Sequence, residues 1–171
     1  MRGNSEVSDA NANPNTIFVL NGPNLNLLGK REPELYGTVG LAQIEADLRR
    51  RLEGGPYGLR FEQTNDGAEA LGWIHEHLDR PYAFCVINPG AWTHTSVALR
   101  DAFLGVRLPF VEVHLTNIFA REPFRRHSYL SDVAEGVICG LGADGYACAL
   151  DYVVRRLRQR DARSGAEKEN R

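Results

Sequence analysis

The sequence predicts an α/β protein in which a five-stranded parallel sheet is doubly wound, with helices on both faces. Short apolar runs of strand length alternate along the chain with longer amphipathic runs. A strand–helix–strand connection makes neighbouring strands parallel and packs the helices against the sheet. The expected strands are 16–20, 59–63, 82–87, 109–113 and 135–139, and the expected helices are 41–53, 68–79, 95–105 and 143–158.

Length and composition fit one domain. The 171 residues are 43% hydrophobic and 25% charged, which is average for globular proteins and sufficient for a core without disulfides. We expect a single catalytic domain over 16–158 between flexible tails at 1–15 and 159–171, because both ends are polar and lack apolar periodicity. One face of the last helix is expected to be buried, with Tyr146, Leu150, Val153, Val154 and Leu157.

The charge balance excludes several partner classes. A formal net charge of -2 and a pI near 6.2 argue against nucleic acid or acidic membrane as the main partner. The first residues lack the apolar segment of a signal peptide, and no apolar run approaches the roughly 18 residues of a membrane span. We therefore expect a cytoplasmic protein.

No metal site is predicted. The chain has an odd number of cysteines: Cys85, Cys139 and Cys148. Each lies in an apolar context without the spacing of metal ligands, so we expect reduced core residues. His75 and His77 are two residues apart on an expected helix, so they point in different directions and are read as exposed polar residues.

The loop 21–38 after the first strand is longer than a strand–helix connection needs, which is typical of a lid or binding loop. It holds Asn24, Arg31 and Tyr36 near the carboxyl edge of the sheet, where such folds bind ligands. Tyr36 alone equally fits an ordinary half-buried tyrosine. A guanidinium beside it, however, would favour the phenolate and make it a base. Three leucines are expected to pack the loop down: Leu25, Leu27 and Leu28.

The third strand ends in NPGAWTHTS, in which Asn88, His94 and the amides of the next helix are expected to face the crevice. Thr95 or Ser96 can cap that helix. A lone histidine is more often structural, but these groups together suit a polar or anionic ligand.

The fourth strand ends in VEVHLTN, where alternation places Glu112 and His114 on one face and Val111, Val113 and Leu115 on the other. A carboxylate beside an imidazole can fix the tautomer of the ring and suit it to general acid catalysis. A surface Glu–His pair at a strand end is the structural alternative. The next loop adds a basic cluster: Arg121, Arg125, Arg126 and His127.

A G-x-G-x-x-G run spans 140–145, but no strand follows it, so it is interpreted as a tight turn and not as a dinucleotide site. A module of the same α/β fold that binds a nucleotide or flavin without catalysis is the alternative from another class. It leaves Arg31, Tyr36, Glu112 and His114 unexplained.

Four motifs in register carry a resemblance across nearly the whole core. They are FVLNGPNLNLLGKREPELYG, NPGAWTHTS, EVHLTN and AREPFRRHSYLS. In this order and spacing they resemble type II 3-dehydroquinate dehydratases. The resemblance implies a flavodoxin-like fold with strand order 2-1-3-4-5, no cofactor, and trimers assembled into a homo-dodecamer. It also implies a lyase that converts 3-dehydroquinate to 3-dehydroshikimate through an enolate, in the shikimate pathway of aromatic amino acid biosynthesis or in quinate breakdown.

The resemblance assigns the catalytic roles by motif position. Tyr36 resembles the base that removes a proton beside the ketone, and Arg31 resembles the lid arginine that activates it. His114 resembles the acid that protonates the leaving hydroxyl, with Glu112 behind it. Asn24 resembles the residue that holds a water against the enolate oxygen.

Further residues resemble substrate contacts: Asn88, His94, Leu115, Thr116 and Arg125. Arg121 resembles a second arginine near the tyrosine, and Asp101 resembles a residue that reaches a neighbouring subunit's site. Thr116 stands where the family usually has serine, which keeps the hydroxyl and adds a methyl group. An imine mechanism needs a buried lysine that can attack the ketone. The chain has two lysines, Lys30 in the lid loop and Lys168 in the charged tail, so this mechanism is not expected.

Overall fold

The strands expected from the sequence form one parallel sheet. The computed structural model describes residues 13–29 and 39–169. Adjacent strands pair in the order β2-β1-β3-β4-β5, and each pair is parallel. The strands are β1 (Thr16–Asn21), β2 (Gly58–Gln63), β3 (Phe84–Asn88), β4 (Phe110–His114) and β5 (Gly136–Cys139). The predicted flavodoxin-like order is confirmed.

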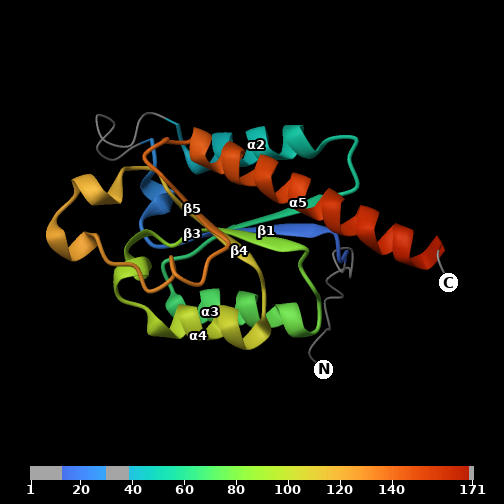
Figure 1. The fold of residues 1–171 in the computed structure, drawn as a ribbon. Helices are drawn as coiled ribbons and strands as arrows, with labels where there is room; N and C mark the ends of the chain where they lie inside the picture. The colour runs from blue at the N-terminus through green and yellow to red at the C-terminus, as the bar shows by residue number, and fades with distance from the viewer. Residues whose placement is uncertain (1–12, 30–38, 170–171) are drawn as a thin grey trace, which may run out of the picture.

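Helices cover both faces of this sheet, with α2 and α5 over one face and α3 and α4 over the other (Figure 1). Their bounds are α2 (Leu41–Leu52), α3 (Gly67–His75), α4 (Val97–Val106) and α5 (Asp144–Glu169). Side chains cap two of the starts, since Asp66 accepts a hydrogen bond from the Ala68 amide and Ser96 accepts one from the Leu99 amide. Of the two caps considered for α4, the structure therefore has Ser96.

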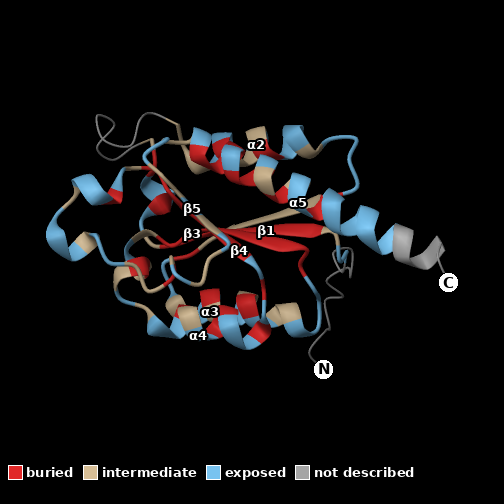
Figure 2. Ribbon diagram, viewed as in Figure 1, coloured by how far each residue is buried: buried red, intermediate tan, exposed pale blue. Residues whose placement is uncertain are grey.

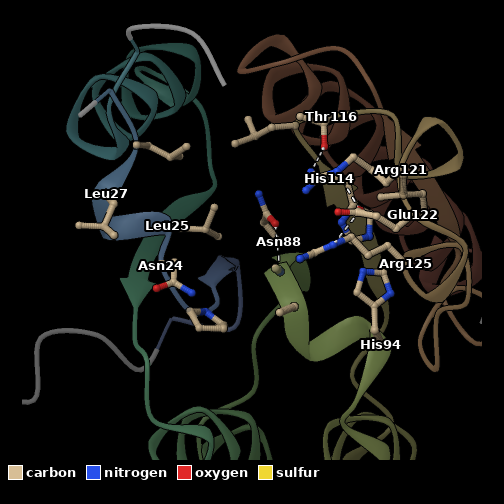
Figure 3. A pocket seen from close by; sticks show the side chains of 16 residues that line it. Asn24, Leu25, Leu27, Asn88, His94, His114, Thr116, Arg121, Glu122 and Arg125 are labelled. Carbon is tan, nitrogen blue, oxygen red and sulfur yellow. Dashed lines mark hydrogen bonds and ion pairs between the residues drawn. The ribbon is translucent and has the colours of Figure 1, made fainter. Parts of the chain in front are cut away.

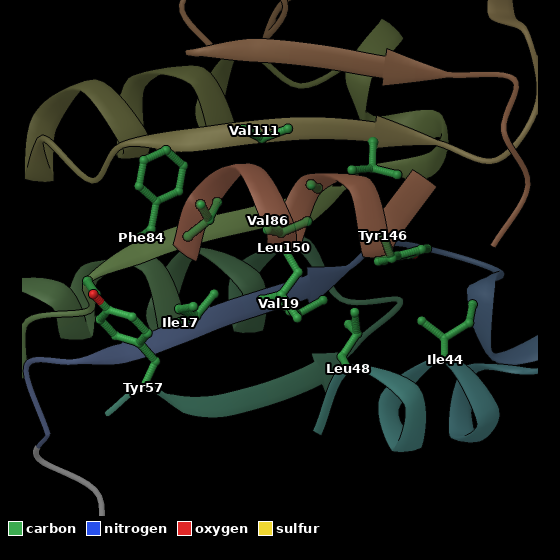
Figure 4. Packing of buried hydrophobic residues seen from close by; sticks show 14 of the residues in the cluster. Ile17, Val19, Ile44, Leu48, Tyr57, Phe84, Val86, Val111, Tyr146 and Leu150 are labelled. Atoms are coloured by element: carbon green, nitrogen blue, oxygen red, sulfur yellow. The ribbon is translucent and has the colours of Figure 1, made fainter. Parts of the chain in front are cut away.

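The central strands β1, β3 and β4 are buried between the two helical layers, whereas the edge strands β2 and β5 are partly exposed (Figure 2). Ile17 and Val19 of β1 belong to the cluster that contains α2 and α5 side chains (Figure 4). Phe18 and Leu20 belong to the cluster on the α3 and α4 side. Each fully buried side chain of this kind contributes about 1.5–3 kcal/mol by leaving water. This alternation fixes the register of β1, because a slip of one residue would exchange the two faces.

Helix α5 continues past its expected end at residue 158 as far as Glu169. Its expected apolar face is confirmed, since Tyr146, Leu150, Val153 and Leu157 are buried and Val154 packs beside them. The segment beyond 158 lacks apolar periodicity but contains strong helix formers, and extending an existing helix requires no new nucleus. The flexibility expected of 159–171 stays a prediction.

The residues weighed as metal ligands differ from expectation. Cys85 is buried, whereas Cys139 is partly exposed and Cys148 is exposed, so the core assignment was wrong for the last two. His75 is exposed, but the His77 ring is half-buried because its Nδ1 accepts a hydrogen bond from the Tyr82 amide at 3.0 Å. Among the described residues, no three His, Cys, Asp or Glu side chains are grouped to hold a metal ion, and no helix is long and apolar enough to cross a membrane.

Candidate active site

A cavity of about 390 Å³ lies at the carboxyl ends of β1, β3 and β4. Asn24 lines it from the loop after β1, Asn88 and His94 from the end of β3 and its loop, and His114 and Arg121 from the end of β4 and its loop (Figure 3). The strand order reverses between β1 and β3, which is where such sheets bind ligands. The predicted crevice is therefore present.

The loop after β1 lies close to the loop after β3. A Cβ at Gly22 would be 2.4 Å from the Pro89 carbonyl oxygen, so only glycine allows this approach. The Gly22 amide donates a hydrogen bond to the Asn88 carbonyl at 2.8 Å. Asn24 adopts a left-handed conformation (φ 66°), which asparagine tolerates, and its backbone N–H donates to Asn65 Oδ1 at 2.8 Å. This turn brings the Asn24 side chain to the cavity wall.

The three leucines of this loop divide differently from the prediction. Leu25 and Leu28 are buried, as expected, whereas Leu27 is 37% exposed. The segment Leu25–Leu27 forms a 3₁₀ turn, in which positions three apart share a side. Residues 25 and 28 therefore pack inward together, and the prediction for Leu27 was wrong.

Asn88 and His94 are held by hydrogen bonds on their inner sides. The Asn88 side chain accepts a hydrogen bond from the Gly90 amide at 3.2 Å and donates one to the Tyr146 hydroxyl at 2.9 Å. His94 Nδ1 lies 2.6 Å from the carbonyl oxygen of His127. Because a carbonyl only accepts, this nitrogen carries the proton and His94 Nε2 is the atom available to a ligand.

The start of α4 does not line the cavity, contrary to expectation. A 3₁₀ turn, Gly90–His94, separates the strand from the helix. Gly90 and Ala91 take the place at the cavity wall that was expected for the first helical amides. This turn favours glycine, because Gly90 has φ +54° and a Cβ at this position would lie 3.1 Å from the Pro23 carbonyl oxygen.

Glu112 and His114 form a buried pair at the end of β4. His114 Nε2 lies 2.8 Å from Glu112 Oε1, and neither side chain is more than 7% exposed. Since a carboxylate only accepts, Nε2 carries the proton, and Nδ1 is the ring atom on the side away from Glu112. His114 lines the cavity and Glu112 lies behind it. The predicted pairing on one face of the strand is confirmed.

Three hydroxyl groups surround the Glu112 carboxylate. Thr93 donates to Oε1, Ser131 donates to Oε2 at 2.5 Å, and Ser128 Oγ lies 3.1 and 3.3 Å from the two oxygens. Burial raises the pKa of Glu112, but the hydrogen bond and charge of His114, with the bonds from Ser131 and Thr93, outweigh it, so the pKa lies below 4.5. A fixed negative charge therefore lies behind the imidazole at neutral pH. Sequence reasoning missed the three hydroxyls, although they stand inside the recognised motifs.

The arginines of the next loop give the cavity positive charge. Arg125 Nε is 3.1 Å and Arg121 Nε is 3.5 Å from the same Glu122 oxygen. Arg121 Nη1 is also 3.5 Å from Thr116 Oγ1. The described lining residues include these two guanidinium groups and one carboxylate, that of Glu122. Arginine binds carboxylates well, so the cavity suits an anionic ligand.

The glycine-rich run at 140–145 is a tight turn, as predicted. Gly140 has φ +87° and Gly142 has φ +56°, which favours glycine at both positions. Their amides donate to the carbonyl oxygens of His114 and Leu115 at 3.2 and 2.9 Å. The turn thus fixes the backbone that carries the candidate acid.

Most predicted site residues come together here. Those that line the cavity are Asn24, Asn88, His94, His114, Leu115, Thr116, Arg121 and Arg125. Arg31 and Tyr36 lie outside the described residues. Asp101 is exposed on α4 and does not line this cavity.

Comparison with known proteins decides the family. The family model for dehydroquinase class II matches residues 15–154. The chain belongs to this family. A 3-dehydroquinate dehydratase from Glaesserella parasuis is 58% identical over 142 residues, which cover 83% of this chain and 96% of that protein. As a member of this family the chain is a lyase, so the alternative of a binding module without catalysis was wrong.

Solved structures agree with the dehydroquinase fold. The crystal structure of a type II dehydroquinase from Propionibacterium acnes has a TM-score of 0.74 and 42% identity, covering 81% of this chain and 95% of that one. A type II dehydroquinase from Butyrivibrio crossotus has a TM-score of 0.78 and 36% identity, covering 81% and 96%. The similarity thus extends over nearly the full length of these relatives.

Proposed function

We propose that this dehydroquinase converts 3-dehydroquinate to 3-dehydroshikimate and water by anti elimination through an enolate. The Glu112–His114 pair at the cavity wall is the observation that carries the proposal, because it offers a proton donor backed by a fixed negative charge. The cavity of about 390 Å³ and its two arginines suit a small carboxylate. The names of the relatives support the same substrate.

The reaction needs a base and an acid of opposite roles. Tyr36, as a phenolate favoured by Arg31, removes the proton next to the ketone and leaves an enolate. His114 then donates a proton to the departing hydroxyl, and the enolate collapses to form the carbon–carbon double bond as water leaves. The cycle ends with Tyr36 protonated and His114 neutral, so Tyr36 must release its proton and His114 must take one up before the next turnover. The motif REPELYG supports the role of Tyr36.

Other cavity residues are assigned to orientation and charge. Asn24 holds a water against the enolate oxygen, and Arg125 binds the carboxylate together with the backbone amides and hydroxyl around Leu115 and Thr116. His94 Nε2 and Asn88 contact substrate hydroxyls. The presence of all of these residues on the wall of one cavity supports this assignment.

We also propose a dodecamer built from four trimers, in which Asp101 reaches the site of a neighbouring subunit, and we assign Arg121 as a second arginine near Tyr36. Asp101 is exposed on α4, where it is free to meet a neighbouring subunit. Light scattering of the purified protein should report twelve chains. A stable and fully active monomer would contradict this assembly. The cytoplasmic location stays a prediction.

The direct test is to incubate the protein with 3-dehydroquinate and follow the ultraviolet absorbance of the conjugated product. Wild type should generate the absorbance, and Tyr36→Phe should lose most of the turnover while keeping the fold. Borohydride added during turnover should leave no adduct, and Lys30→Arg should remain active. Substrate-dependent trapping on Lys30, detected by mass spectrometry, would replace the enolate with an imine mechanism.

A further inference from the structure

A chain of hydrogen bonds lies beneath the cavity on the α2 and α5 side of the sheet. Tyr146 is fully buried in that core cluster (Figure 4), and its hydroxyl joins the ends of two strands. It donates to Asn21 Oδ1 at 2.5 Å and accepts from Asn88 Nδ2 at 2.9 Å. Asn21 Nδ2 in turn donates to the Glu62 carbonyl at 3.0 Å, and Asn88 Oδ1 accepts from the Gly90 amide at 3.2 Å.

The two ends of this chain fix its direction. The Glu62 carbonyl can only accept, so the NH₂ group of Asn21 must face it and Oδ1 must face Tyr146. The Gly90 N–H can only donate, so Oδ1 of Asn88 must face Gly90 and the NH₂ group must face Tyr146. The phenol alone can both donate to one asparagine and accept from the other. Any flip of the Asn88 amide would place two donors opposite each other at Gly90.

The phenol is suited to orientation and not to proton transfer. Burial raises the pKa of Tyr146 far above the usual value for tyrosine, and the hydrogen bond from Asn88 offsets only part of this rise. The hydroxyl therefore remains protonated at neutral pH. Its two partners, Asn21 and Asn88, are buried as well, so neither has water as a substitute partner.

Asn88 connects this hydrogen-bond chain to the cavity. Its side chain lies between the Asn24 side and the His114 side of the cavity (Figure 3). The NH₂ group of Asn88 has two N–H bonds. One donates to the Tyr146 hydroxyl, which leaves the other for an acceptor oxygen. A flipped amide would present a carbonyl oxygen at the same place and would repel that acceptor.

We propose that Tyr146 is a positioning residue for substrate recognition, which acts by holding the Asn88 amide with its NH₂ group towards a substrate oxygen. This inference rests on the proposed function, in which Asn88 contacts the substrate. It predicts that loss of the phenol oxygen weakens substrate binding and leaves the chemical step nearly unchanged.

The test is Tyr146→Phe, with Tyr57→Phe as the matched control. Tyr57 is also buried, and its hydroxyl binds Asp161 at the other end of α5, remote from the cavity. One lost neutral hydrogen bond corresponds to about a three- to tenfold effect, so KM for 3-dehydroquinate should rise by that factor while kcat changes less than about twofold. Tyr57→Phe should change neither constant.

A double-mutant cycle with Asn88→Ala separates positioning from general loosening of the fold. If Tyr146 acts through Asn88, adding Tyr146→Phe to Asn88→Ala should change KM by less than about twofold. An unchanged KM in Tyr146→Phe, or an equal rise in both backgrounds, would overturn the inference. Wild type without turnover would instead refute the proposed function.

If Tyr146→Phe does not fold at the assay temperature, Asn21→Ala replaces it. This variant keeps the phenol but frees its hydroxyl to donate to Asn88 Oδ1, so it should show the same rise in KM. Loss of the folded state in both variants, measured by circular dichroism, would overturn the inference by showing that the network serves folding and not recognition.

Discussion

Two buried polar networks reach the cavity from opposite faces of the sheet, and they differ in charge. On the α3 and α4 side, the Glu112 carboxylate is held by hydroxyls and by His114. On the α2 and α5 side, Asn21, Tyr146 and Asn88 form a neutral chain. Burying a charge is costly unless many donors surround it. The comparison indicates that a buried charge is present where a proton must move, beside His114. Neutral groups are sufficient where a side chain, Asn88, must only be oriented.

The largest effect is expected at the end of the charged network. His114→Ala removes the proposed acid, so kcat should fall by about 10²- to 10⁴-fold. Steady-state kinetics with 3-dehydroquinate would measure this, and His75→Ala, at an exposed position on α3, is the matched control. Full turnover in His114→Ala would require a different proton donor.

Glu112→Gln should have the next largest effect. It keeps the shape of the side chain but removes the charge behind His114, and hydrogen bonds to charged groups are worth about 1.5–3 kcal/mol. We therefore expect kcat to fall roughly 10- to 100-fold with little change in KM. Glu135→Gln removes a surface carboxylate paired with Arg156 and should be silent. A rise in KM alone would assign Glu112 to binding instead.

The charged network should also respond to acid. The pKa of Glu112 is lowered in the fold, so its contribution to stability is fully present above the unfolded value near 4.5 and is lost as the pH falls through the folded pKa. At pH 7 Glu112→Gln should cost about 1–3 kcal/mol in the free energy of unfolding. Urea titrations of both proteins below pH 4.5 should show this difference shrinking. A difference that grew on acidification would mean that the carboxyl is protonated in the native state.

The smallest effect is expected far from both networks. Tyr57→Phe breaks a hydrogen bond to a half-exposed aspartate and should cost about 0.5–1 kcal/mol in stability, with kcat and KM unchanged. Thermal melting and steady-state kinetics would check it. An altered KM would show that the far end of α5 communicates with the cavity.

The sequence predicts these two networks unequally. The alternation in VEVHLTN predicts the Glu112–His114 pair, because two residues on one strand are related by local geometry alone. Thr93, Ser128 and Ser131 approach Glu112 from other segments, 16 to 19 residues away in the sequence, so no strand or helix period marks them. Tyr146 is predicted as a core residue from helical periodicity, yet its partner Asn21 lies 125 residues away. Periodicity shows which side is buried, whereas hydrogen-bond partners depend on tertiary packing.

The sequence predicts the fold better than its irregular parts. The sheet order and the buried face of α5 follow from patterns repeated along the chain. The 3₁₀ turns at 25–27 and 90–94 have a different period, which exposes Leu27 and separates the cavity from the start of α4. The helical extension to Glu169 depends on helix propensity and not on an apolar face.

The most direct test of this division of roles is to measure kcat and KM of Glu112→Gln and Tyr146→Phe side by side with wild type on 3-dehydroquinate. We predict that Glu112→Gln loses kcat at nearly constant KM, and that Tyr146→Phe raises KM at nearly constant kcat. If both variants changed the same constant, the charged and neutral networks would share one role, and the account would be contradicted.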